Sequence, residues 1–179
     1  MMRAAFLAGL LAAGPAAAAT DAATLIDLLD ERCLTPMMAG QPADVTGMEI
    51  ASGAPAVGAP GSQHDVADVI PGVDLRLKTL SSGVSSCVLS HEIAEQSQAD
   101  AVNDRLTAHA GELRFVQMQA PCDSEGLHSY RMFESAAPTS KGQLIGILSF
   151  VVDVADLPAV QSVMVAESDV PLTRHEACK

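Results

Sequence analysis

The sequence predicts an α+β protein, with an antiparallel sheet of about five to six strands and two helices packed on it. Three observations predict this class. Two segments repeat apolar residues at helical spacing, several short segments alternate apolar with polar residues or are apolar throughout, and turn-forming residues separate them. The predicted order of elements is α-β-β-α-β-β-β-β, and four cysteines are expected to staple the fold with disulfides.

The first helix is expected to follow Thr20 or Asp21, because either side chain can cap it. Pro36 is expected to end this helix, since proline disrupts a helix interior. The apolar face of the helix consists of Ala22, Ile26, Leu29 and Cys33. A cysteine on this face is expected to be buried, as a structural sulfur would be.

Residues 40–61 contain eight glycines or prolines among twenty-two residues. This composition disfavours both helix and strand, so the segment is predicted to be a long irregular loop. The loop separates the first helix from the main body of one domain, which is predicted to span residues 20–179.

Strand alternation is clearest over residues 73–80, where apolar and charged side chains take turns. Residues 81–83 (Ser-Ser-Gly) predict a hairpin turn into a second strand over 84–91. The second helix is predicted over 95–110, and Gly111 is expected to close it in the left-handed conformation.

The remaining chain predicts strands over 115–119, 128–134 and 144–154. Residues 144–154 are apolar on both faces, which predicts a central strand covered above and below. A last strand is predicted over 159–167, with a helix capped by Asp156 as the alternative. The sequence shows no internal repeat.

Residues 1–19 have the composition of a cleavable export signal. Arg3 supplies the positive charge, residues 4–13 are apolar, and the alanines at 16–19 favour cleavage after Ala19. The apolar stretch is shorter than the roughly 20 residues that a membrane-spanning helix needs. We therefore expect a periplasmic or secreted protein, with no membrane insertion after the signal is removed.

The composition disfavours several classes of ligand. The chain has ten Lys and Arg residues and 22 Asp and Glu residues, and the resulting net charge of −12 repels nucleic acids and anionic membrane surfaces. Aromatic residues make up only 3% of the chain, which leaves few rings on which sugars or bases could stack.

An oxidising compartment predicts that the four cysteines form structural disulfides. Of the three pairings, Cys33–Cys87 and Cys122–Cys178 are preferred, because they would fasten the first helix to the hairpin and the tail to a turn. The chain has no C-x-x-C motif, so a redox-active dithiol is not expected.

Soft-metal binding is one alternative function, because thioethers and thiolates prefer copper(I). The thioether candidates are Met37, Met38 and Met48. His64, with Asp65 and Asp68, is a further candidate in an acidic loop. Methionine also fills irregular cores, and disulfide-bonded cysteines cannot ligate a metal, so no metal or other cofactor is predicted.

Enzymatic activity is not predicted, and no residue is assigned a catalytic role. The chain lacks a G-x-S-x-G elbow and a phosphate-binding glycine loop, which leaves a small hydrolase using His64 or His91 as a second alternative. The favoured interpretation is a soluble exported domain that binds a protein or peptide partner, because sheet edges and long loops commonly serve recognition.

Overall fold

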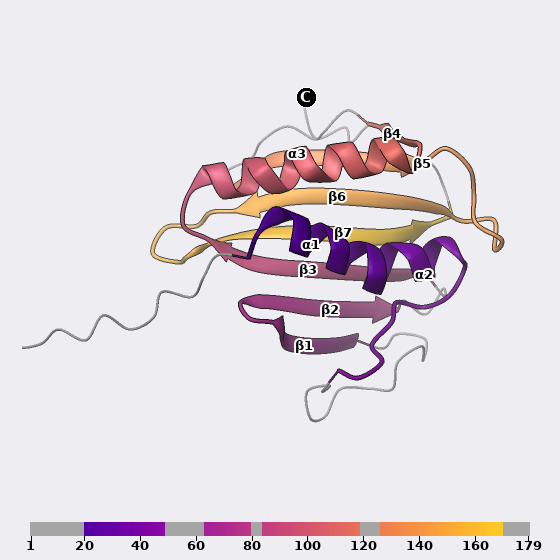
Figure 1. Ribbon diagram of the computed structural model, residues 1–179, viewed down its shortest axis with the longest axis horizontal. Helices are drawn as coiled ribbons and strands as arrows, with labels where there is room; N and C mark the ends of the chain where they lie inside the picture. The colour runs from indigo at the N-terminus through magenta and orange to yellow at the C-terminus, as the bar shows by residue number, and fades with distance from the viewer. Residues whose placement is uncertain (1–19, 49–62, 80–83, 119–125, 170–179) are drawn as a thin grey trace, which may run out of the picture.

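The computed structural model describes residues 20–48, 63–79, 84–118 and 126–169, and it confirms the α+β class (Figure 1). The elements are α1 (Ala22–Leu29), the π-helical turn η1 (Asp30–Leu34), α2 (Thr35–Met38), β1 (Gln63–Ile70), β2 (Val73–Thr79), β3 (Ser85–Ile93), α3 (Gln96–Glu112), β4 (Phe115–Gln117), β5 (Leu127–Ser135), β6 (Leu144–Val152) and β7 (Ala159–Ser168). All strands belong to one antiparallel sheet, in the order β1-β2-β3-β7-β6-β5-β4.

The sheet has seven strands, so the predicted five to six and the predicted order were wrong by one strand. The strand that was missed is β1, which pairs with β2 at the edge of the sheet. Its alternation is weak, because a bulge interrupts the pairing between Val66 and Ile70 and Asp68 adopts a positive φ of 48°. The last strand is β7, which confirms strand rather than helix over residues 159–167.

The prediction that Pro36 ends the first helix was wrong. The helical path continues through η1, where the N–H of Thr35 donates to the carbonyl of Asp30, five residues back. Pro36 then lies in the first turn of α2, and the carbonyl of Arg32, four residues before it, accepts instead from the N–H of Asp44 at 2.7 Å. Asp21 caps α1 by accepting a hydrogen bond from the N–H of Thr24 at 3.0 Å.

The start of α3 is fixed by Glu95, which forms a capping box with Gln98. Gly111 was predicted to close this helix, and that prediction was wrong because Gly111 lies within α3. The residue with positive φ is Arg114, at 61°, two positions beyond the helix. An arginine in this conformation gave no turn signal in the sequence.

The Cys33–Cys87 disulfide is present and joins η1 to β3, as predicted, with 5.8 Å between the two Cα atoms. Both cysteines are fully buried. The predicted partners Cys122 and Cys178 lie outside the described residues. Of the predicted loop over 40–61, residues 40–48 are described and contain neither helix nor strand.

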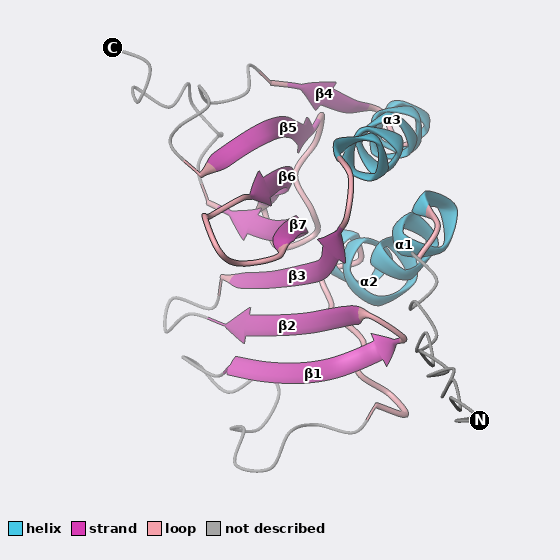
Figure 2. Ribbon diagram, turned by 90° about the vertical axis from the view of Figure 1, so that its left-hand side faces the viewer, coloured by secondary structure: helices cyan, strands magenta, loops and turns pink. Residues whose placement is uncertain are grey.

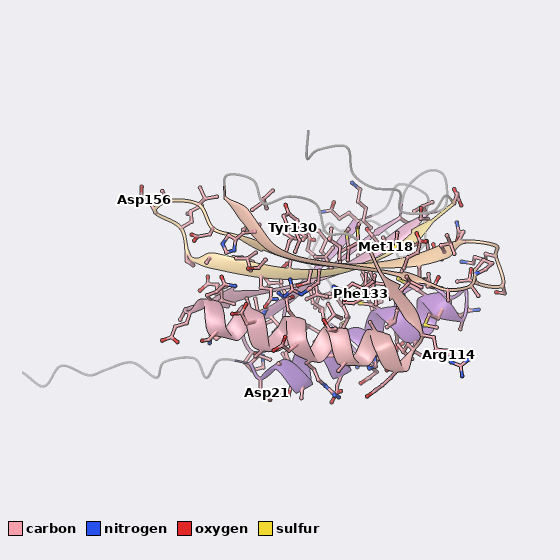
Figure 3. The ribbon with its side chains drawn as sticks, turned by 90° about the horizontal axis from the view of Figure 1, so that it is seen from above. Asp21, Arg114, Met118, Tyr130, Phe133 and Asp156 are labelled. Atoms are coloured by element: carbon pink, nitrogen blue, oxygen red, sulfur yellow. A yellow bond between two sulfur atoms is a disulfide. The ribbon has the colours of Figure 1, made fainter. Side chains whose placement is uncertain are left out.

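All the helices lie on one face of the sheet (Figure 2). The main core forms between them and the inward side chains of the strands, among them Leu75, Leu89, Ile147 and Val163. Strand β6 was predicted to be covered on both faces. Among the described residues the helices cover only one, and we call the other the helix-free face. Figure 3 shows Phe133 on the helix side and Tyr130 on the helix-free side.

The fold contains a repeat that the sequence did not show. A helix and three paired strands occur twice, as α1-β1-β2-β3 and as α3-β5-β6-β7, with the short β4 inserted between α3 and β5 and with β3 and β7 adjacent at the centre. Leu75 pairs with Leu89 in the first unit, and Ser149 pairs with Val163 in the second. Both partners shift by 74 residues (149 less 75, 163 less 89), so the two hairpins share one register.

Candidate functional site

Two features distinguish the surface of the protein. The first is a hollow of about 870 Å³ at one end of the sheet, lined by residues of the β1–β2 turn, the end of β3 and the β6–β7 turn. The second is an apolar patch on the helix-free face. The lining of the hollow includes Thr20, Asp68, Asp74, His91 and Glu92.

His91 lies on β3 beneath α3, with 7% of its surface exposed. Its Nε2 lies 3.1 Å from Oε1 of Gln161, its register partner on β7. The Nε2 of Gln161 in turn donates to the carbonyl of Ala99 at 3.3 Å and to the Oγ of Ser149 at 3.2 Å. Ser149 donates to Oδ1 of Asn103 at 2.7 Å. These buried polar groups therefore satisfy one another and hold α3 on the sheet.

The hydrogen bonds of the Gln161 amide determine which ring nitrogen of His91 carries a proton. Because its NH₂ group donates to Ala99 and Ser149, its oxygen must accept, so Nε2 of His91 carries a proton. Burial lowers the pKa of His91, and its hydrogen bonds to Gln161 and to the backbone of Glu92 oppose this only in part. His91 is thus a buried neutral side chain that fixes the floor of the hollow.

This state of His91 predicts a loss of stability in mild acid. A histidine whose pKa is lowered by folding binds its proton more readily in the unfolded chain, where the pKa is about 6.5. Its contribution to stability is complete above that value and disappears as the pH falls through the folded-state pKa. We expect the free energy of unfolding in urea to fall between pH 7 and pH 5, and to fall less in His91→Gln. Equal pH slopes for the two proteins would contradict this role.

Two of the carboxylates in the hollow also shape the β1–β2 turn. Oδ1 of Asp68 accepts from the N–H of Gly72 at 3.0 Å, and Oδ1 of Asp74 accepts from the N–H of Asp68 at 3.0 Å. Glu92 is exposed on β3, and its register partner is Val160, which also lines the hollow. Among the described residues, the lining contains no lysine or arginine, and its formal charges at neutral pH are negative.

His91 lines the hollow together with residues that carry hydroxyl and carboxylate groups, as the hydrolase alternative requires. However, His91 forms no hydrogen bond with these groups in the described residues. Ser90 and His91 are consecutive on β3, so their side chains point to opposite faces. The Oγ of Ser90 pairs with the Oγ of Ser162 at 2.9 Å, and His91 bonds to an amide. Among the described residues, no hydroxyl of the hollow therefore has a histidine as its base.

A serine, a histidine and an aspartate do meet at the start of β5, and the sequence did not indicate them. The Oγ of Ser129 lies 3.1 Å from Nδ1 of His128, whose Nε2 is 3.9 Å from Oδ2 of Asp153. Ser129 has a positive φ of 58° and accepts a hydrogen bond from Gln96 at 2.7 Å. The distance from His128 to Asp153 exceeds that of a hydrogen bond, so Asp153 does not orient the ring.

The candidate metal ligands occupy different environments. Met37 is buried in the core, Met38 is 38% exposed, and Met48 packs on the edge of the core. The side chain of His64 lies outside the described residues, although its backbone belongs to β1. Within the part of the chain that the structure describes, no three His, Cys, Asp or Glu side chains are grouped as a metal site would require.

The apolar patch lies mainly on the strands of the second repeat and extends onto β3 of the first. Val88, Met164, Leu148 and Met132 are successive register partners across β3, β7, β6 and β5. Beside this row, the rings of Tyr130 and Phe150 have their centroids 6.3 Å apart. Met132 is buried, and the other five are half-buried. The sequence signal for this patch was the apolar character of 144–154, which was interpreted as a covered central strand.

No protein-family model matches this sequence, and no significant similarity connects it to a curated protein or to a solved structure. Among the described residues, no helix is both long and apolar enough to span a membrane.

Proposed function

We propose that this protein is a non-enzymatic binding domain of an oxidising compartment such as the periplasm, and that it binds a polypeptide segment on the helix-free face. The observation that carries the proposal is the apolar patch of Val88, Tyr130, Met132, Leu148, Phe150 and Met164. An antiparallel sheet normally presents polar residues on a face that meets water. Apolar side chains gathered on such a face favour a site of association.

The first repeat can be compared with the second at the positions of the apolar patch. In the shared register of the two hairpins, Leu148 and Phe150 occupy the positions that Asp74 and Arg76 hold in the first unit. The same strand pair therefore folds with charged side chains at these positions. Stability of the hairpin alone does not require Leu148 or Phe150 to be apolar, which supports a role in binding.

The charge of the protein favours a polypeptide over a lipid surface as the partner. The net charge is −12, and Asp153 and Asp156 in the β6–β7 turn are exposed at one end of the patch. Anionic membrane surfaces repel such a protein. The Cys33–Cys87 disulfide supports an oxidising compartment.

The test replaces Phe150 by the residue that the first repeat carries at the same position. We expect peptides selected from a random phage-displayed 12-residue library on the full chain to bind Phe150→Arg at least about tenfold more weakly, as for a central aromatic contact. The fold should persist with a loss of about 1 kcal/mol, from the contact with Tyr130.

Met38→Arg is the matched control, because it adds the same charge at an exposed methionine on the helix side. This variant should bind the selected peptides as the unaltered protein does. Failure to enrich any peptide, or equal binding to Phe150→Arg and Met38→Arg, would reject the helix-free face as the binding surface.

A further inference from the structure

The chain leaves the sheet after β7, at the end opposite the hollow. Ser168, the last residue of β7, pairs with Leu144 at the start of β6. The next residue, Asp169, accepts a hydrogen bond at 3.1 Å from the side-chain amide of Gln143, which directly precedes β6. The tail that follows, residues 170–179, therefore starts on the β6 side of β7.

The second end of this tail is expected to be fixed by a disulfide. Because Cys33 is joined to Cys87, the two remaining cysteines of the chain are Cys122 and Cys178. An oxidising compartment favours their pairing. The two thiols would give up two electrons and two protons to a disulfide oxidoreductase of the compartment, whose own disulfide is reduced to two thiols.

Chain connectivity places Cys122 across the second unit from the start of the tail. Four residues before it, the N–H of Met118 donates to the carbonyl of Met132 in β5 at 2.8 Å. Four residues after it, the carbonyl of Gly126 accepts from the N–H of Asp153, just beyond β6, at 2.8 Å. Cys122 therefore belongs to the outer side of β5, towards the end of the sheet that carries the hollow.

The shortest path between these two points crosses the apolar patch. It covers about three strand spacings and about six positions along the strands, or about 25 Å in a straight line. The nine residues from 170 to 178 reach about 30 Å when extended, and the disulfide adds about 6 Å. A path round β4 would need about 40 Å, and α3 occupies the other face of β4 and β5 (Figure 2).

The first residues of the tail suit this path. Val170 and Leu172 lie on either side of Pro171, so they face the same way in an extended segment. The sheet beneath them carries Gly146 and Ala166, which are register partners without bulky side chains. The apolar side chains of the tail can therefore lie low over the sheet and contact the patch two positions further along.

We propose that residues 170–178, tied to Cys122 by a second disulfide, lie across the apolar patch over Met164, Leu148 and Met132, and that a partner must displace them. This inference rests on the proposed function, because it names the first occupant of the same surface. A tethered segment acts at an effective concentration of about 1 mM. If it docks with a dissociation constant of about 0.1 mM, it weakens the binding of a free peptide about tenfold.

The first experiment observes the patch directly in the full chain, exported and labelled with ¹³C in the methionine methyl groups. The methyl signals of Met132 and Met164 should shift in Leu172→Asp. Thr173→Asp adds the same charge at the next residue, which faces the opposite way in an extended tail, and should leave both signals in place. Met38, exposed on the helix side, is the reference signal and should not respond to either variant.

The second experiment tests the tether. Peptide mapping without reduction should recover Cys122 joined to Cys178. The double variant Cys122→Ser/Cys178→Ser should bind the peptides selected on the full chain about tenfold more tightly than the unaltered protein, because the tail no longer competes at a high effective concentration.

The outcomes separate this inference from the proposed function. Free thiols at both cysteines, equal methyl shifts in Leu172→Asp and Thr173→Asp, or unchanged peptide binding by the double serine variant would overturn the docked tail. If Phe150→Arg still weakened peptide binding in that case, the proposed function would stand alone. Methyl shifts specific to Leu172→Asp, without binding of any peptide, would support the docked tail and reject a peptide partner.

Discussion

Replacing both Cys33 and Cys87 by alanine is expected to lower the free energy of unfolding by about 4 kcal/mol. The disulfide closes a loop between residues 54 apart in the sequence, so its loss restores the conformational entropy of a long segment in the unfolded chain. That segment includes α2, β1 and β2. For a single domain, a loss of this size is a large part of the total stability.

Urea unfolding of the double variant measures this effect, with the unaltered protein under oxidising conditions as the reference. Reduction of the unaltered protein should lower the midpoint at least as far, since it breaks the same bond together with the predicted Cys122–Cys178 disulfide. The single variant Cys33→Ala should match the double variant, because either change removes the bond. A double variant that loses less than about 1 kcal/mol would contradict the importance of the disulfide.

The second large effect is expected at Gln161. Gln161→Leu keeps the approximate size of the side chain but leaves the Nε2–H of His91 without its acceptor and removes the hydrogen bonds to the Ala99 carbonyl and to Ser149. Each buried polar group without a partner costs about 1–3 kcal/mol, so we expect a total loss of about 3 kcal/mol. The loss should be accompanied by weaker protection of α3 against hydrogen exchange, because the network connects this helix to the sheet.

Gln117→Leu provides the matched control for this prediction, because it makes the same chemical change at an exposed position of β4. It should alter the stability by no more than about 0.5 kcal/mol. Similar losses for the two variants would show that the buried network does not hold α3.

Sequence reasoning succeeded where one residue pattern matched one environment. Strand β2 alternates apolar and charged side chains, and it lies with one face on the core and one towards solvent. Cys33 was placed on the buried face of the first helix, and this face does carry it to Cys87. In both cases the periodicity of the sequence predicted the buried face correctly, because the tertiary contacts bury the same face.

The errors arose where tertiary contacts decide the structure. The pattern of β1 is interrupted by a bulge between Val66 and Ile70, where Asp68 has a positive φ, so strict alternation could not reveal the strand. His91 was considered as a possible base, but its neighbour Gln161 is 70 residues away in the sequence. No spacing rule connects such a pair.

The repeat was hidden for a related reason. Its two copies share a register, but the positions of Asp74 and Arg76 are taken by Leu148 and Phe150 in the second copy. These residues lie on the helix-free face. The apolar patch could therefore be recognised only after the two copies had been aligned by their strand pairing.

The position of the disulfide relative to the repeat has a consequence for the integrity of the molecule. Cys33 and Cys87 both belong to the first unit, so within the described residues only the backbone near Ala94 and Glu95 links the two units covalently. Both of these residues are exposed. A chain cleaved there would consist of two fragments. The hydrogen bonds between β3 and β7 and the contacts between α1 and α3 would then hold the fragments together.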